Sequence, residues 1–427
     1  MTVLGALGRR VSAAASTTAT TDFASTQAAM SEDGAAATPR SGIVEGGAGA
    51  TTATTTTATT GAWLPEHGVG DRRFLDIGDV ELESGAVLQD VTMAYETWGT
   101  LDPDGGNAIL VLHALTGDSH LRGPASRAHA SPGWWEQMVG PGCPIDTDRY
   151  YVIAPNILGG CQGSTGPSSI APDGRHWGSR FPLLTVRDQV EAERRLRDAL
   201  SIQRWALVVG GSMGGMRAVE WAASYPSEVE RLAVIASSAR ATADQIAWNT
   251  AQSAAIRMDP EFRGGDYYDV PGGRGPQHGL GIARRIAHTT YRTADELEDR
   301  FGNRPQADED PFDGAGRHQI TSYLEHHAGK LSRRFDANSY LLLAHSMNTH
   351  DVGRGRGGTA AALERIRART LVVAIDTDRL FPPVLVEEMA THIPHSDWRV
   401  AHSVIGHDAF LLAHPDLDEW IRGLLGR

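Results

Sequence analysis

The stretch Trp205-Ala-Leu-Val-Val-Gly-Gly-Ser-Met-Gly-Gly215 joins a β-rich run to a glycine-rich turn, and a helix-like segment follows from Met213 to Tyr225. It contains the pattern G-x-S-x-G with Ser212 at its centre. Between a strand and a helix, this pattern is typical of a nucleophile elbow, in which glycines permit a sharp turn that exposes the serine hydroxyl. A phosphate-binding turn is the alternative, but the stretch has neither G-x-G-x-x-G nor a Walker lysine. We therefore predict that Ser212 is a nucleophile.

The rest of the chain alternates between strand-like and helix-like segments. Short apolar runs predict buried strands, and segments of helical length separate most of them. The predicted strands are 91–99, 108–115, 150–156, 205–211, 231–238, 369–376 and 398–404, and the clearest helices are 188–200, 213–225, 382–393 and 415–425. This alternation indicates an α/β domain with a mostly parallel sheet and helices on both faces. Residues 240–350 break it and predict a helical insertion that forms a lid over a site.

An elbow serine needs a base and an orienting acid, which follow in the order Ser, Asp or Glu, His in this type of fold. His407 lies in Gly406-His-Asp-Ala-Phe410, directly after the last predicted strand. Asp376 and Asp378 both follow the preceding strand, and we favour Asp378 because it lies further into the loop. Loops at the carboxyl ends of parallel strands are where sites of α/β proteins form. Ser212, Asp378 and His407 are thus the predicted catalytic residues.

Two backbone N–H groups are expected to stabilise a negatively charged oxygen beside Ser212. One belongs to Met213, the residue after the nucleophile, and the other comes from the loop after an early strand. That loop is His113-Ala-Leu-Thr-Gly117, in which we select Leu115 as the donor. His113 is predicted to have a structural role.

Composition narrows the classes of partner. The chain has 427 residues, of which 39 are basic and 52 acidic, so the formal net charge is −13. Such a charge disfavours nucleic acid and anionic membrane surfaces as partners, and no apolar run is long enough for a transmembrane helix. Cys143 and Cys161 fit neither a disulfide scaffold nor a zinc site, so no metal is predicted. Residues 1–62, rich in Ala, Thr, Ser and Gly, predict a disordered tail before a catalytic domain at 63–427 in a cytoplasmic protein.

Seven pieces of the sequence, in order, resemble the homoserine O-acetyltransferases, an α/β-hydrolase-fold family of methionine biosynthesis. The pieces are His113-Ala-Leu-Thr-Gly-Asp-Ser-His120, Gly159-Gly-Cys-Gln-Gly-Ser-Thr-Gly-Pro167, Gly210-Gly-Ser-Met-Gly-Gly215, Ala283-Arg-Arg285 with Thr290-Tyr291, Tyr323-Leu-Glu-His326, Thr377-Asp-Arg-Leu-Phe-Pro382 and Gly406-His-Asp-Ala-Phe410. The resemblance spans about residues 74–425, and residues 348–357 are similar to actinobacterial members in particular. Arg217 departs from it, since many relatives have Gln there.

The resemblance implies substrates and binding residues. Arg284, with Arg285 as the less favoured register, corresponds to the family's substrate arginine and would bind the homoserine carboxylate. Asp408 corresponds to the residue that takes the amine, and Tyr291, two helical turns after Arg284, would assist. The implied substrates are L-homoserine and acetyl-CoA, which is a co-substrate and not a bound cofactor. A homodimer is implied by resemblance only.

The resulting hypothesis is double displacement, in which Ser212 carries the acetyl group from acetyl-CoA to the homoserine hydroxyl. Several alternatives stay open at this stage. A relative could use a succinyl donor or a serine acceptor, and the same triad could serve an esterase, because the fold does not fix the acceptor. A non-enzymatic interaction protein on a hydrolase scaffold is a further alternative, which a complete triad argues against.

Overall fold

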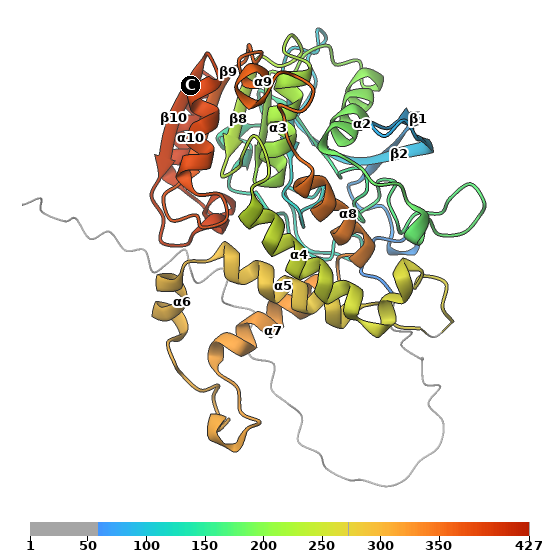
Figure 1. The fold of residues 1–427 in the computed structure, drawn as a ribbon. Helices are drawn as coiled ribbons and strands as arrows, with labels where there is room; N and C mark the ends of the chain where they lie inside the picture. Colours follow the sequence, from blue (N-terminus) through green and yellow to red (C-terminus); the bar gives the residue numbers. More distant parts are fainter. Residues whose placement is uncertain (1–58, 272, 427) are drawn as a thin grey trace, which may run out of the picture. The chain divides into compact units, whose positions relative to one another are not determined.

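An eight-stranded sheet forms the centre of the computed structural model, which describes residues 59–271 and 273–426 (Figure 1). The strand order is β1-β2-β6-β3-β7-β8-β9-β10. β1 pairs antiparallel with β2 and β2 with β6, whereas all pairs from β6 to β10 are parallel. The strands are β1 (Arg73–Glu81), β2 (Val87–Trp98), β3 (Ala108–Leu112), β6 (Tyr151–Pro155), β7 (Leu207–Gly211), β8 (Arg231–Ile235), β9 (Arg369–Ile375) and β10 (Ser396–Ala401). The α/β-hydrolase fold predicted from the sequence is confirmed.

Burial explains which strands the sequence revealed. Every residue of β3 and β7 is buried, as the continuous apolar runs require in a sheet covered on both faces. β1 was not predicted, because only Val80 of its nine residues is buried and its sequence therefore lacks an apolar run. β4 (Val139–Gly140) and β5 (Ile145–Asp146) form a separate two-stranded pair.

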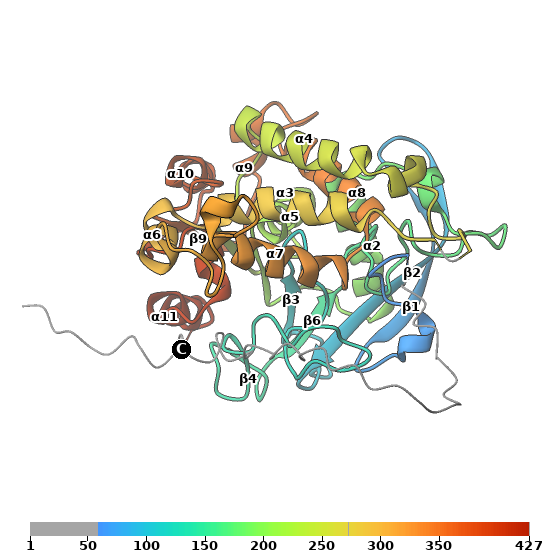
Figure 2. The same cartoon turned by 90° about the horizontal axis from the view of Figure 1, so that it is seen from below.

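Helices cover both faces of the sheet. One core contains side chains of α2 (Val186–Ala199), α3 (Met213–Ser224), α9 (Thr359–Leu363) and α10 (Pro383–His392). The core on the other face contains Leu417, Ile421 and Leu424 of α11 (Pro415–Leu424). Figure 2 shows α10 and α11 on opposite sides of β9. No helix of the described residues has both the length and the apolar character that a membrane span needs.

The predicted helical insertion at 240–350, which lies between β8 and β9, holds five α-helices among its described residues. They are α4 (Ala243–Met258), α5 (Gln277–Tyr291), α6 (Ala294–Phe301), α7 (Gln319–Ser332) and α8 (Ala337–Asn348). In Figure 1, α4, α5 and α7 lie together below the sheet. A third apolar cluster joins side chains of this insertion to Leu115, Met213 and Phe381 of the sheet loops. The insertion therefore packs on the loops that carry the predicted site.

The folded domain begins before the predicted boundary at residue 63. Thr60 donates a hydrogen bond to the buried Asp336 carboxylate (2.8 Å), and Ala62 is 1% exposed within the third cluster. The predicted tail lies outside the described residues as far as residue 58. The low-complexity composition of residues 59–62 gave no sign that they belong to the folded domain, because they contact residues that are distant in sequence.

A buried ion pair lies behind the elbow. Arg217 of α3 contacts Glu193 of α2, and both side chains are 0% exposed. Arg217 also donates to the carbonyl of His113 (2.7 Å), and Trp221 Nε1 donates to Glu193 (2.8 Å). Arg217 therefore joins the elbow helix to the loop after β3.

Replacing Arg217 with Met should lower the free energy of unfolding by about 3–5 kcal/mol, because Glu193 would be left buried and unpaired. Urea unfolding followed by tryptophan fluorescence measures the change. The double variant Arg217→Met/Glu193→Met removes both charges and should recover most of the loss. A double variant as unstable as the single one would contradict this account.

Candidate active site

Ser212 occupies the sharp turn between β7 and α3. Its backbone is at φ 56° and ψ −125°, a conformation that costs a non-glycine residue about 1–3 kcal/mol and that the surrounding structure must enforce. Ser212 N–H donates to the Ile235 carbonyl (3.0 Å), and Ser237 Oγ donates to the Ser212 carbonyl (2.7 Å). A Cβ on Gly214 would lie 2.0 Å from the Leu112 carbonyl oxygen, so only glycine lets α3 start directly against the end of β3.

The structure brings Ser212, His407 and Asp378 into one hydrogen-bonded chain. Nε2 of His407 lies 2.9 Å from Ser212 Oγ, and Nδ1 lies 2.6 Å from Asp378 Oδ2. The other oxygen of Asp378 accepts from the N–H groups of Leu380 and Phe381, both at 2.8 Å. This arrangement can take the proton of the serine hydroxyl and hold the imidazole in a single orientation.

Asp376, the alternative acid, lies elsewhere. Its carboxylate contacts His402 Nδ1 (2.9 Å) and accepts from the Ser403 N–H (3.0 Å) on the surface. The side chain of Asp376 is 34% exposed, whereas that of Asp378 is 0% exposed. Of the two aspartates that the sequence offered as the orienting acid, Asp378 is therefore the one in contact with His407.

The pKa of His407 is raised above its ordinary value. Burial lowers it, but the charge and hydrogen bond of Asp378 and the charge of Asp408 together outweigh burial. The imidazole is therefore a stronger proton acceptor than its burial alone would permit.

Leu115 and Met213, the predicted donors to the oxyanion, lie beside Ser212. Leu115 lines a pocket with Ser212, and Met213 is the first residue of α3. His113 contacts the Ala114 carbonyl through Nδ1 (2.8 Å) and accepts from the Ile157 N–H through Nε2 (3.1 Å). Burial and the charge of Arg217 lower the pKa of His113 to about 3, so the ring is neutral. It holds the loop after β3 in place and does not contact Ser212.

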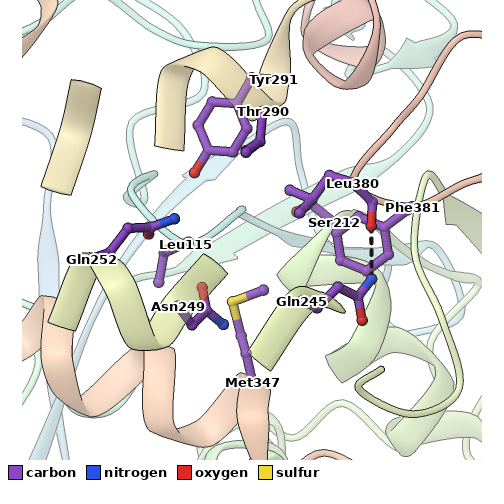
Figure 3. Close-up of a pocket in the computed structure, with 10 residues that line it drawn as sticks. All are labelled: Leu115, Ser212, Gln245, Asn249, Gln252, Thr290, Tyr291, Met347, Leu380 and Phe381. Atoms are coloured by element: carbon purple, nitrogen blue, oxygen red, sulfur yellow. Dashed lines mark hydrogen bonds between the residues drawn. The ribbon is translucent and has the colours of Figure 1, made fainter. Parts of the chain in front are cut away.

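The pocket beside Ser212 has a polar wall that the sequence analysis missed. Figure 3 shows Gln245, Asn249 and Gln252 of α4 on one side, with Thr290 and Tyr291 of α5 on another. Gln245 also donates to the Leu380 carbonyl (2.9 Å), which ties α4 to the loop that carries the acid. The spacing of these three amides, on one face of a helix, was the available signal.

The predicted binding residues lie on the insertion side of the triad. Tyr291 stands between two groups, with ring distances of 5.5 Å to the Arg284 guanidinium and 5.7 Å to His407. Arg284 Nη1 also lies 3.5 Å from Thr116 Oγ1. Arg285 is instead exposed and lies 3.9 Å from Glu325. Arg284, the favoured candidate for the substrate arginine, is therefore the one of the two that faces the site.

Asp408 follows the base and lies near two arginines. Its nearest ion-pair contact is Arg292, at 3.9 Å. Burial raises the pKa of Asp408, and the charges of Arg284, His407 and Arg292 act against that rise. A carboxylate in this position can receive an ammonium group.

One group of potential metal ligands occurs within the described ranges, formed by Asp71, Glu96, His120 and His129. Glu96 accepts from Ser119 (2.7 Å) and contacts His120 Nδ1 (2.9 Å), whereas His120 Nε2 and His129 Nδ1 have no hydrogen-bond partner among the described residues. The rings of His120 and His129 stack at 3.8 Å, so a single ion could not lie in the plane of both rings. We therefore interpret the group as an anchor for the loop after β3.

The sequence is similar to known proteins of one family. Residues 107–413 match the family model described as alpha/beta hydrolase fold. The chain is 57% identical over 370 residues to a homoserine O-acetyltransferase of Thermobifida fusca (strain YX), covering 86% of this chain and 97% of that protein. It is 56% identical over 353 residues to the protein of the same name from Nocardia farcinica (strain IFM 10152), covering 82% and 92%.

Solved structures of two kinds resemble the fold. The crystal structure of homoserine O-acetyltransferase from Bacillus anthracis aligns with a TM-score of 0.75 at 26% identity, over 83% of this chain and 97% of that chain. The crystal structure of esterase E22 aligns equally well, with a TM-score of 0.75 at 28% identity, over 83% and 99%. The fold alone therefore does not separate transferase from esterase, whereas the sequence relatives do.

Proposed function

This chain belongs to the homoserine O-acetyltransferases, acyltransferases of the α/β-hydrolase fold, and we propose that it moves the acetyl group of acetyl-CoA to the hydroxyl of L-homoserine through Ser212. The observation that carries the mechanism is the hydrogen-bonded chain from Ser212 through His407 to Asp378. The product is O-acetyl-L-homoserine.

The first half-reaction acylates the serine. Ser212 Oγ attacks the thioester carbon of acetyl-CoA while its proton passes to His407 Nε2, and Asp378 stabilises the imidazolium. The N–H groups of Met213 and Leu115 would hold the oxyanion of the tetrahedral intermediate. When the C–S bond breaks, His407 returns the proton to the CoA thiolate, and the acetyl ester of Ser212 remains.

The second half-reaction transfers the acetyl group. The homoserine hydroxyl attacks the acetyl carbon while His407 accepts its proton, and Ser212 leaves and recovers that proton. Arg284 would bind the acceptor carboxylate and Asp408 its ammonium, with Tyr291 between Arg284 and His407. No metal or bound cofactor enters either step, and acetyl-CoA is consumed as a co-substrate.

An esterase is the second candidate, favoured by the likeness to esterase E22. A matrix of donors and acceptors decides between the two: acetyl-CoA and succinyl-CoA, each with homoserine, serine and water. We expect the highest turnover for acetyl-CoA with homoserine. Hydrolysis that exceeds transfer at saturating homoserine would overturn the proposal.

The raised pKa of His407 predicts the pH dependence of acylation. His407 accepts a proton only when it is neutral, so the rate rises with pH through its pKa, which should lie above the ordinary value of about 6.5. Asp408→Asn removes a charge that stabilises the imidazolium, so the rise of the acylation rate with pH should occur at lower pH. The measurement is the rate of CoA release as a function of pH. A rise that occurs at higher pH in Asp408→Asn than in the wild type would contradict this prediction.

Arg284→Ala should lower the efficiency of transfer to homoserine at least about tenfold, since one hydrogen bond between charged groups contributes about 1.5–3 kcal/mol. Acylation by acetyl-CoA should change far less, because the thioester end has no α-carboxylate. Rapid-quench measurement of CoA release and product formation separates the two steps. Arg285→Ala is the matched control, and an equal fall in both steps would make Arg284 a support of the insertion.

A cytoplasmic location and a homodimer complete the proposal, together with homoserine and acetyl-CoA as the small-molecule partners. The dimer rests on the family resemblance. Light scattering coupled to size-exclusion chromatography tests it, and a monomer at micromolar concentration would remove it.

A further inference from the structure

Two arginines of the insertion meet at a single residue of the loop after β3. Arg334, just beyond α7, donates from Nη1 to the Thr116 carbonyl (2.8 Å), and Arg284 of α5 reaches the Thr116 hydroxyl (3.5 Å). Thr116 follows Leu115, which lines the pocket with Ser212. The two guanidinium groups therefore approach the reacting centre from different elements.

Neither guanidinium has an ion-pair partner among the described residues, although their neighbours do. Arg292, directly after α5, pairs with Glu296, and Arg285 lies 3.9 Å from Glu325. Burial lowers the pKa of Arg334, and the like charge of Arg284 lowers it further, while Asp118 opposes both. An anion placed between these two half-buried cations would offset the cost of their burial and their mutual repulsion.

The length of the acceptor decides which anion fits. Four bonds separate the hydroxyl oxygen of homoserine from its carboxylate carbon, so the two groups lie within about 5 Å of each other. With the hydroxyl at His407, a carboxylate within that reach can meet the pocket wall that Leu115 forms beside Ser212, next to Thr116. The phosphates of CoA are separated from the thioester by the whole pantetheine arm and cannot reach this position.

We propose that Arg334 is a second binding residue for the carboxylate of the acceptor, and that it forms with Arg284 a two-guanidinium clamp joined at Thr116. The inference rests on the proposed function and extends it. One carboxylate can accept from both guanidinium groups, and the clamp would reject acceptors that lack a carboxylate.

The test compares two acceptors in the full-length enzyme. Homoserine carries the carboxylate, whereas 3-amino-1-propanol has the same hydroxyl and amine without it. Arg334→Ala should reduce kcat/KM for homoserine at least about tenfold, mainly through KM, and leave kcat/KM for 3-amino-1-propanol nearly unchanged. Arg333→Ala, the exposed neighbour, is the control for stability and for both acceptors. Arg334→Lys keeps the charge without the planar fork and should show a smaller loss.

Other outcomes overturn the inference in distinguishable ways. An equal loss for both acceptors, or slower acylation by acetyl-CoA, would mean that Arg334 only positions the loop through Thr116. Slower acylation of Arg334→Ala by succinyl-CoA alone would assign the clamp to a carboxylate on the donor. Unchanged homoserine kinetics in Arg334→Ala and in Arg334→Lys would remove Arg334 from the clamp. If the wild-type enzyme did not acetylate homoserine, the proposed function itself would fail.

Discussion

Ser212→Ala is expected to lower kcat by about 10⁴–10⁶, the range for loss of a triad nucleophile. The hydroxyl is 2.9 Å from His407 Nε2, and the strained backbone at φ 56° presents it at the pocket. Alanine removes the atom that becomes acylated and leaves the neighbouring packing in place. The remaining activity would reflect binding and oxyanion stabilisation alone.

Mass spectrometry adds a direct readout of the same step. Wild-type protein mixed with acetyl-CoA in the absence of homoserine should carry one acetyl group on the peptide that contains Ser212. Cys161→Ala is the matched control, since a thiol is the other side chain that readily accepts an acyl group; burial raises the pKa of Cys161, so it should not react. An adduct that persists in Ser212→Ala would disprove double displacement through this serine.

Asp378→Asn should lower kcat by about 10⁴, because an amide favours the wrong tautomer of His407. The buried carboxylate lies 2.6 Å from His407 Nδ1 and is fixed by two backbone N–H groups. Asp376→Asn, a substitution two residues earlier at the surface, should leave kcat nearly unchanged. Both variants are compared by steady-state kinetics after thermal melting confirms that they fold.

The reverse order of effects would move the acid to Asp376. A small effect of both substitutions would mean that His407 needs no buried carboxylate, which the hydrogen-bond geometry argues against. Because the two variants differ only in which carboxylate is neutralised, their ratio isolates the role of the contact with His407.

Much of the site was predictable because its chemistry lies at strand ends. Ser212 and Asp378 each follow a buried strand, and His407 follows the half-buried strand β10, so an apolar run precedes the first two in the sequence. The ends of strands were predicted less well: β3 stops at Leu112, three residues before the predicted end, since the chain turns there to meet Gly214. β1 was missed because its exposed face carries polar side chains.

Other features depend on contacts that no local pattern encodes. Arg334 meets Thr116 across 218 positions of sequence, and Thr60 meets Asp336 across 276. The buried partner of Arg217 could not be predicted either, because an arginine on a helix is usually solvated. Such long-range polar contacts required the tertiary structure.

The place of the helical insertion between β8 and β9 has an evolutionary consequence. Arg284, Tyr291 and Arg334 all belong to this one continuous segment, whereas Ser212, Asp378 and His407 lie outside it. Substitutions within this one segment could therefore change three of the four proposed acceptor-binding residues and leave the triad intact, whereas Asp408 lies outside it. A chimera that carries the corresponding segment of another relative would test whether the acyl acceptor changes with it.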